Sequence, residues 1–157
     1  AERARTLDPR AEPGPRVRAT RSVFYPDTED VMGWRIGTHG FRILLSAQVP
    51  QIARERVRPD LDRFLAEHAL TRAAIRSWVC HPGGPKVLQA LEQGLELPDG
   101  ALALSWESLR NAGNLSSASV LLILERTLER ARPPAGSPGV MLAMGPGFCS
   151  ELLLLDW

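Results

Sequence analysis

The segment WVCHPGGPK, residues 78–86, constrains the fold of this chain more than any other segment. A short apolar run of strand type ends at His81, and two glycines followed by Pro85 then open a helix. Strands that alternate with helices in this way are typical of α/β proteins. The sequence therefore predicts that His81 stands at the end of a strand in an α/β fold.

The rest of the chain continues this alternation. Strands are expected at residues 17–24, 41–45, 76–80, 140–144 and 151–155, and helices at 50–70, 84–95, 116–130 and from Ser105 onward. Residues 27–40 carry glycine and mixed polarity, which predicts a loop with one helical turn at 30–34. Residues 1–15 are charged and proline-rich and are interpreted as a tail or linker, so the folded domain is expected to span 16–157.

Composition excludes several classes of protein. The chain has 157 residues, enough for one domain with a core, and its net charge of +1 gives no reason to expect a nucleic-acid partner. No apolar run approaches the roughly 18 residues that cross a bilayer. Two cysteines without secretory features indicate reduced thiols and a cytosolic location, and the chain lacks the CxxC or HxxxH spacing of a zinc site.

A second motif stands downstream, where Asn114 lies between Gly113 and the hydroxyl-rich segment 115–119. A neutral imidazole and a carboxamide that meet at one point can both donate hydrogen bonds to a single carbonyl oxygen. His81 and Asn114 are therefore candidates for stabilising an enolate or oxyanion. Two simpler interpretations stay open, because a histidine at a strand end is often structural and an asparagine often caps a helix.

Three motifs in order carry a resemblance to a known family. HPGGPK at 81–86, GNLSSAS at 113–119 and GPGF at 145–148 resemble the C-terminal half of type III polyketide synthases, the chalcone and stilbene synthase-like family. Residues 32–50 and 142–157 are most similar to the bacterial branch that makes alkylpyrones and alkylresorcinols.

This resemblance implies one half of a thiolase-like layered fold, with a mixed five-stranded sheet and helices over residues 16–157. It implies an acyltransferase that condenses an acyl-CoA starter with malonyl-CoA by decarboxylative Claisen condensation, without a cofactor. The expected partners are coenzyme A thioesters, an N-terminal half that carries the nucleophilic cysteine, and a second copy of the complete enzyme. A half-fold of this kind is also expected to expose a large apolar face.

The resemblance assigns roles to particular residues. His81 and Asn114 match the catalytic histidine and asparagine by motif position, and they would hold the charge that decarboxylation leaves on the thioester oxygen. Cys80 is not expected to be the nucleophile, because neighbouring side chains of a strand point to opposite faces. Cys149 is interpreted as a packed thiol, with a place in the cavity wall as the alternative.

Six further residues, at four places in the sequence, match the substrate path of the family. Ile43 stands where chalcone synthases carry a gatekeeping phenylalanine, which suggests a wider passage for a long acyl chain, although Ile43 could equally be core. Ser116 matches a serine near the catalytic site, with a helix-capping hydroxyl as the simpler account. Gly145, Pro146 and Gly147 match the loop beside the cyclisation pocket, or form a tight turn. Lys86 matches a position near the CoA entrance, or lies in solvent.

Two other functions remain open from the sequence. An initiating ketoacyl-carrier-protein synthase-like enzyme also uses cysteine, histidine and asparagine, but typically has an HQAN-like motif where this chain has HPGG. Alternatively, the chain is a non-catalytic half-domain that acts as an assembly module.

Overall fold

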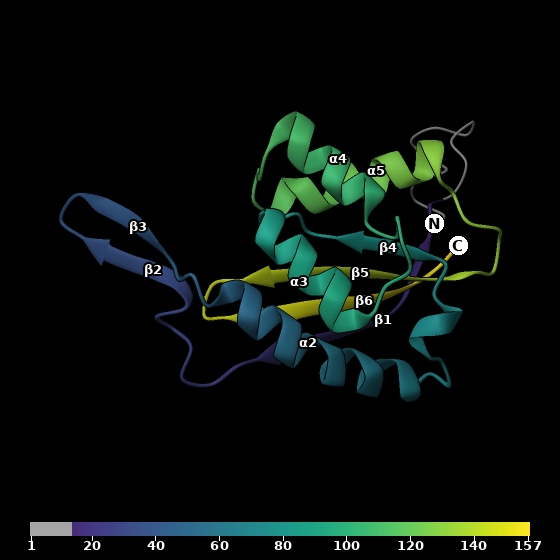
Figure 1. Cartoon of the computed structure of the whole chain (residues 1–157), viewed down its shortest axis with the longest axis horizontal. Coiled ribbons are helices and arrows are strands. Elements are labelled where there is room, and N and C mark those ends of the chain that lie inside the picture. Colours follow the sequence, from purple (N-terminus) through teal and green to yellow (C-terminus); the bar gives the residue numbers. More distant parts are fainter. Residues whose placement is uncertain (1–13) are drawn as a thin grey trace.

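A four-stranded mixed sheet forms the centre of the computed structural model, which describes residues 14–157 (Figure 1). The strands lie in the order β1 (Arg16–Phe24), β6 (Cys149–Asp156), β5 (Pro138–Gly145) and β4 (Ser77–Cys80). β4 runs parallel to β5, whereas the pairs β5–β6 and β1–β6 are antiparallel. The tail expected at residues 1–15 falls, up to residue 13, outside the described residues.

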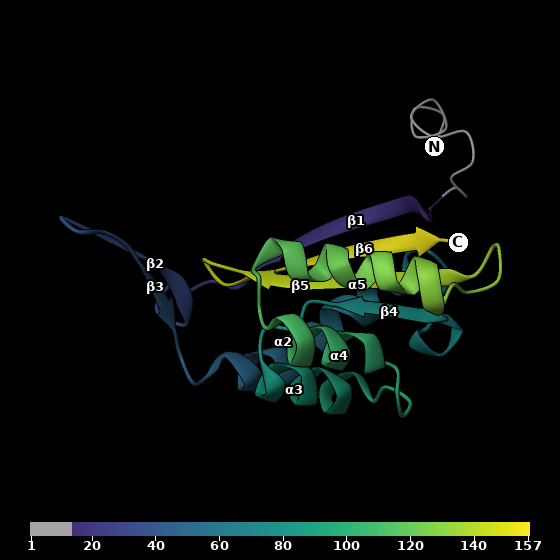
Figure 2. The same ribbon diagram turned by 90° about the horizontal axis from the view of Figure 1, so that it is seen from above.

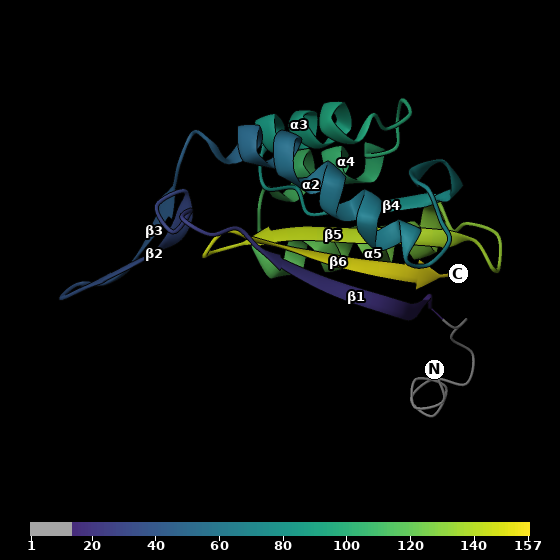
Figure 3. The same cartoon turned by 90° about the horizontal axis from the view of Figure 1, so that it is seen from below.

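Helices cover both faces of this sheet, as Figures 2 and 3 show. Alternate strand residues such as Cys80 and Leu142 pack in one core with α2 (Val49–Ala66) and α3 (Pro85–Leu95). The residues between them, among them Val79 and Met141, pack against α5 (Ser117–Arg130). This period-two division of side chains produces three layers and confirms the expected α/β class with a mixed sheet.

The helices agree with the sequence-based ranges to within a few residues. α2 is one continuous helix with Pro59 inside it, and α4 (Ala103–Ala112) begins two residues before Ser105. A single 3₁₀ turn, η1 (Arg72–Ala74), precedes β4. None of the helices in the described part of the chain is long and apolar enough to cross a membrane.

A β-hairpin outside the main sheet corrects two expectations. β2 (Met32–Gly37) pairs antiparallel with β3 (Gly40–Leu45) and projects from the body of the molecule (Figure 1). The loop expected at 27–40 was therefore wrong for residues 32–37, and the segment 41–45 belongs to the hairpin instead of completing a five-stranded sheet. The apolar residues at alternate positions of β2 are a strand pattern that the neighbouring glycines conceal.

Candidate functional site

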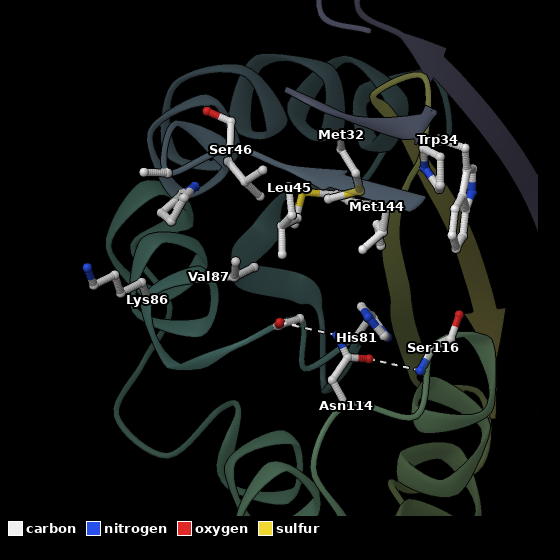
Figure 4. Close-up of a pocket in the computed structure, with 16 residues that line it drawn as sticks. Met32, Trp34, Leu45, Ser46, His81, Lys86, Val87, Asn114, Ser116 and Met144 are labelled. Carbon is white, nitrogen blue, oxygen red and sulfur yellow. Dashed lines mark hydrogen bonds between the residues drawn. The ribbon is translucent and has the colours of Figure 1, made fainter. Parts of the chain in front are cut away.

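A cavity of about 630 Å³ opens at the carboxyl ends of β4 and β5. Ligands of α/β proteins commonly bind at this edge of a parallel strand pair. The hairpin, the β4–α3 turn, the α4–α5 loop and the β5–β6 turn all contribute to the wall (Figure 4). The main lining residues are Met32, Trp34, Ile43, Leu45, His81, Gly83, Lys86, Val87, Asn114, Ser116, Met144 and Pro146.

His81 directly follows β4 and lines this cavity. Its backbone N–H donates to the carbonyl of Leu142 at 2.8 Å, which extends the pairing with β5 by one residue. Cys80 lies on the opposite side, fully buried in the core with α2 and α3, as the strand alternation predicted. Partial burial lowers the pKa of His81 below its ordinary value of 6.5, so its imidazole is neutral near pH 7 and retains one N–H donor.

Asn114 faces the same cavity from the α4–α5 loop, and its carboxamide is oriented at both ends (Figure 4). The Oδ1 atom accepts the backbone N–H of Ser116 at 2.9 Å, and Nδ2 donates to the carbonyl of Gly83 at 3.2 Å. One hydrogen of the amide is used in the second bond, which leaves the other for a ligand in the cavity. Gly83 is only two residues from His81, so this bond ties the two motifs together.

Ser116 lines the cavity, and the alternative interpretation of its hydroxyl as a helix cap was wrong. Ser116 stands at the N-cap position of α5 without a side-chain capping bond, and its φ of 57° is unusual for a residue other than glycine. The Oγ of Ser119 instead accepts the N–H of Leu115 at 2.7 Å. Backbone strain of this kind costs about 1–3 kcal/mol and is concentrated at functional sites.

The turn Gly145–Pro146–Gly147 joins β5 to β6, and Pro146 lines the cavity between the two glycines. Gly147 has a φ of 90° and donates its N–H to the carbonyl of Met32 at 2.7 Å. This bond attaches the turn to the start of the hairpin. The two interpretations made from the sequence, a tight turn and a wall of the pocket, are therefore compatible.

Lys86 and Ile43 lie at different parts of the wall. Lys86 is exposed in the first turn of α3, whereas Ile43 stands in β3 directly opposite Trp34 of β2. Both Ile43 and Trp34 line the cavity, so its width depends on the indole as well as on the residue at position 43. The sequence reasoning missed Trp34, Met32 and Leu45, although their alternation with other residues was a usable signal.

Neither cysteine lines the cavity. Burial raises the pKa of the Cys80 thiol to about 12, which disfavours the thiolate that a nucleophile needs. Cys149 is partly buried, and its Sγ lies 3.9 Å from the carbonyl oxygen of Pro146. No group of three or more histidine, cysteine, aspartate or glutamate side chains within residues 14–157 could hold a metal ion.

Comparison with known proteins decides the family. A family profile described as "Chalcone and stilbene synthases, C-terminal domain" matches residues 16–156 of this chain. The chain belongs to the chalcone and stilbene synthase family. The resemblance carried by the three motifs is thereby confirmed over nearly the whole chain.

Individual members of this family are similar to the chain over less than half their own length. A 1,3,6,8-tetrahydroxynaphthalene synthase of Streptomyces peucetius is 57% identical over 143 residues, which are 91% of this chain and 38% of that protein. An alpha-pyrone synthesis polyketide synthase-like protein of Mycobacterium tuberculosis is 32% identical over 155 residues, which are 98% of this chain and 39% of that protein. Both proteins are bacterial, as the resemblance implied.

A solved structure supports the same assignment. The crystal structure of the tetrahydroxynaphthalene synthase of Streptomyces coelicolor, a bacterial type III polyketide synthase, matches with a TM-score of 0.86 and 30% identity. The match covers 94% of this chain and 42% of that one. The chain therefore has the thiolase-like fold of these enzymes and spans about two-fifths of the length of its relatives.

Proposed function

We propose that this chain is the C-terminal part of a type III polyketide synthase and supplies two hydrogen-bond donors for a decarboxylative condensation. The observation that carries the proposal is that His81 and Asn114 line one cavity, with the amide of Asn114 oriented by two hydrogen bonds. Preoriented donors lower the free energy of a developing oxyanion without having to reorganise during the reaction.

In the proposed reaction, a cysteine thiolate from outside these residues first accepts the starter acyl group from coenzyme A. Malonyl-CoA then loses carbon dioxide, and the electron pair of the broken C–C bond passes to the α-carbon and thioester oxygen as an enolate. His81 and Asn114 donate to this oxygen. The enolate carbon attacks the carbonyl carbon of the acyl-cysteine, a new C–C bond forms, and the thiolate leaves.

The apolar side chains of the cavity suit an acyl or polyketide chain. Met32, Trp34, Ile43, Leu45 and Met144 form much of the wall, and the proposed acyl passage runs past Ile43. Lys86, exposed in the first turn of α3, is proposed to contact a phosphate of coenzyme A. Ser116 and the turn at residues 145–147 are proposed to contact the growing chain.

The proposed protein partner is the N-terminal part of the same synthase, and the complete enzyme is proposed to form a homodimer. The exposed apolar face of the hairpin supports the proposal that another protein surface packs against it. Ile36 and Phe41 are paired across the two strands and are 74% and 73% exposed. Trp34, Ile43 and Leu45 of the same hairpin are also more than half exposed, and a contiguous apolar patch of this kind commonly marks an interaction surface.

The test is malonyl-CoA decarboxylation by the full-length synthase, measured as release of labelled carbon dioxide. We expect His81→Ala and Asn114→Ala each to lower the rate by about 10²- to 10³-fold, because each removes one oxyanion donor. His39→Ala and Asn111→Ala are matched controls, since both residues are exposed and lie outside the cavity. The proposal fails if the two cavity variants decarboxylate malonyl-CoA as fast as these controls.

The same assay separates the other enzyme class. Condensation that requires an acyl carrier protein and does not accept coenzyme A thioesters would favour an initiating ketoacyl-carrier-protein synthase. The family match and the HPGG motif at residues 81–84 favour the coenzyme A substrates.

A further inference from the structure

Helix α4 connects the two candidate catalytic residues physically. Its first turn contains Ser105, and the loop that carries Asn114 begins where the helix ends at Ala112. Ser105 is fully buried, and its Oγ donates to the backbone carbonyl of Cys80 at 2.8 Å. Cys80 immediately precedes His81, so the Ser105 hydroxyl binds this helix to the peptide group that joins Cys80 to His81.

The geometry of β4 explains why this carbonyl needs a side-chain donor. The N–H of His81 points toward β5, because it donates to Leu142. In a trans peptide the carbonyl of Cys80 points the opposite way, toward the outer edge of the sheet, where β4 has no neighbouring strand among residues 14–157. The strand is buried along its whole length, and a buried carbonyl without a donor is unfavourable.

We propose that Ser105 is a positioning residue, which holds the Cys80–His81 peptide plane and thereby the direction of the His81 imidazole. With the peptide held on one side by Leu142 and on the other by Ser105, the plane cannot rotate without breaking one of two hydrogen bonds. This inference rests on the proposed catalytic function of His81. It goes beyond that function by assigning a role to a residue outside the cavity.

The same bond also sets the distance between the two donors. α4 is anchored at its first turn beside His81, and its last turn leads through Gly113 to Asn114, whose amide returns to the carbonyl of Gly83. The two bonds, from Ser105 and from Asn114, therefore connect both ends of α4 to the backbone on either side of His81. Loss of the Ser105 bond detaches the first turn of α4 from the backbone that precedes His81.

The chain contains a matched control one helical turn away. Ser108 lies on α4, is also fully buried, and has an Oγ without a hydrogen-bond partner among the described residues. Ser105→Ala and Ser108→Ala therefore remove the same atom from the same helix at the same burial. Only the first variant removes a bond to the backbone beside His81.

The experiment measures malonyl-CoA decarboxylation by the full-length synthase and separates kcat from KM. We expect Ser105→Ala to lower kcat by about 10- to 100-fold with less than about a twofold change in KM, since small displacements of a catalytic group have effects of this size. Ser108→Ala is expected to keep the wild-type kcat. Equal kcat values for the two alanine variants would overturn the proposal.

Two further measurements keep the test decisive. If Ser105→Ala does not fold, Ser105→Cys replaces it. The thiol has a similar shape to the hydroxyl but is a much weaker donor, so it fills the same space while weakening the bond to the Cys80 carbonyl. A lowered kcat with unchanged KM in Ser105→Cys supports the proposal, and a wild-type kcat overturns it. The wild type and His81→Ala are measured in parallel. If His81→Ala keeps the wild-type rate, the proposed function itself has failed. If His81→Ala is inactive and Ser105→Ala is normal, the positioning role alone is refuted.

Discussion

Titration of Tyr25 offers a direct test of the packing behind the cavity. Tyr25 is the single tyrosine of the chain, and it is almost completely buried at the end of β1. Its hydroxyl donates to Asp60 at 3.1 Å and lies 3.0 Å from the Oγ of Ser150. Its backbone N–H donates to the carbonyl of Phe148, the residue after the Gly145–Gly147 turn. The pKa of the Tyr25 phenol is therefore a measure of how tightly the residues beside this turn are packed.

The size of the effect follows from the shift in pKa. Burial raises the pKa of Tyr25 from 10.0 to about 12, and the negative charge of Asp60 acts in the same direction. A shift of two pKa units corresponds to about 3 kcal/mol of preference of the folded state for the neutral phenol. This stabilisation is complete below pH 10, where the unfolded chain also keeps its proton, and it is lost as the pH rises to about 12.

The assay is the ultraviolet absorbance of tyrosinate in the chain, folded and in urea. We expect a midpoint near 12 in the folded chain and near 10 in urea. Tyr25→Phe gives an independent check, because it leaves the buried Ser150 hydroxyl without its phenol partner at a cost of about 1–3 kcal/mol at neutral pH. Above pH 10 the unfolded wild type ionises its tyrosine and its free energy of unfolding falls, whereas the variant has no phenol to ionise. The difference in the free energy of unfolding between the two proteins therefore shrinks.

Comparison of the wild type with Tyr25→Phe also removes the contribution of Cys80, whose raised pKa acts in the same pH range in both proteins. The reasoning is refuted by a folded-state midpoint near 10, or by a stability difference that stays constant between neutral pH and pH 12.

Two further predictions concern the cavity region. Cys149 is expected to react with a thiol reagent in the folded chain, while Cys80 is protected. Cys80 is fully buried, and burial raises its pKa to about 12. Equal labelling rates of the two cysteines would contradict this packing. The lowered pKa of His81 is expected to make the chain less stable as the pH falls below 6.5, since the unfolded chain binds the proton more readily. Urea unfolding measures this loss, and an unchanged pH dependence in His81→Gln would show that another group causes it.

Local sequence patterns determined most of the helices and the strands of the main sheet. The turn from β4 into α3 was recognisable because Gly83, Gly84 and Pro85 are suited to a turn and the first residues of a helix. The opposite directions of Cys80 and His81 followed from strand geometry alone. The hairpin was missed, because the turn-forming glycines of residues 33–40 outweighed the alternating Met32, Trp34 and Ile36.

The sequence alone, through its ordered motifs, identified the family and nominated His81 and Asn114. Only the tertiary structure brought these residues to one cavity, because they are separated by α3 and α4 and meet only when both helices pack on the sheet. It also decided that Trp34 faces Ile43 and that Ser105 donates to Cys80. Such contacts depend on the relative placement of distant elements, which is set by burial over the whole chain rather than by local propensity.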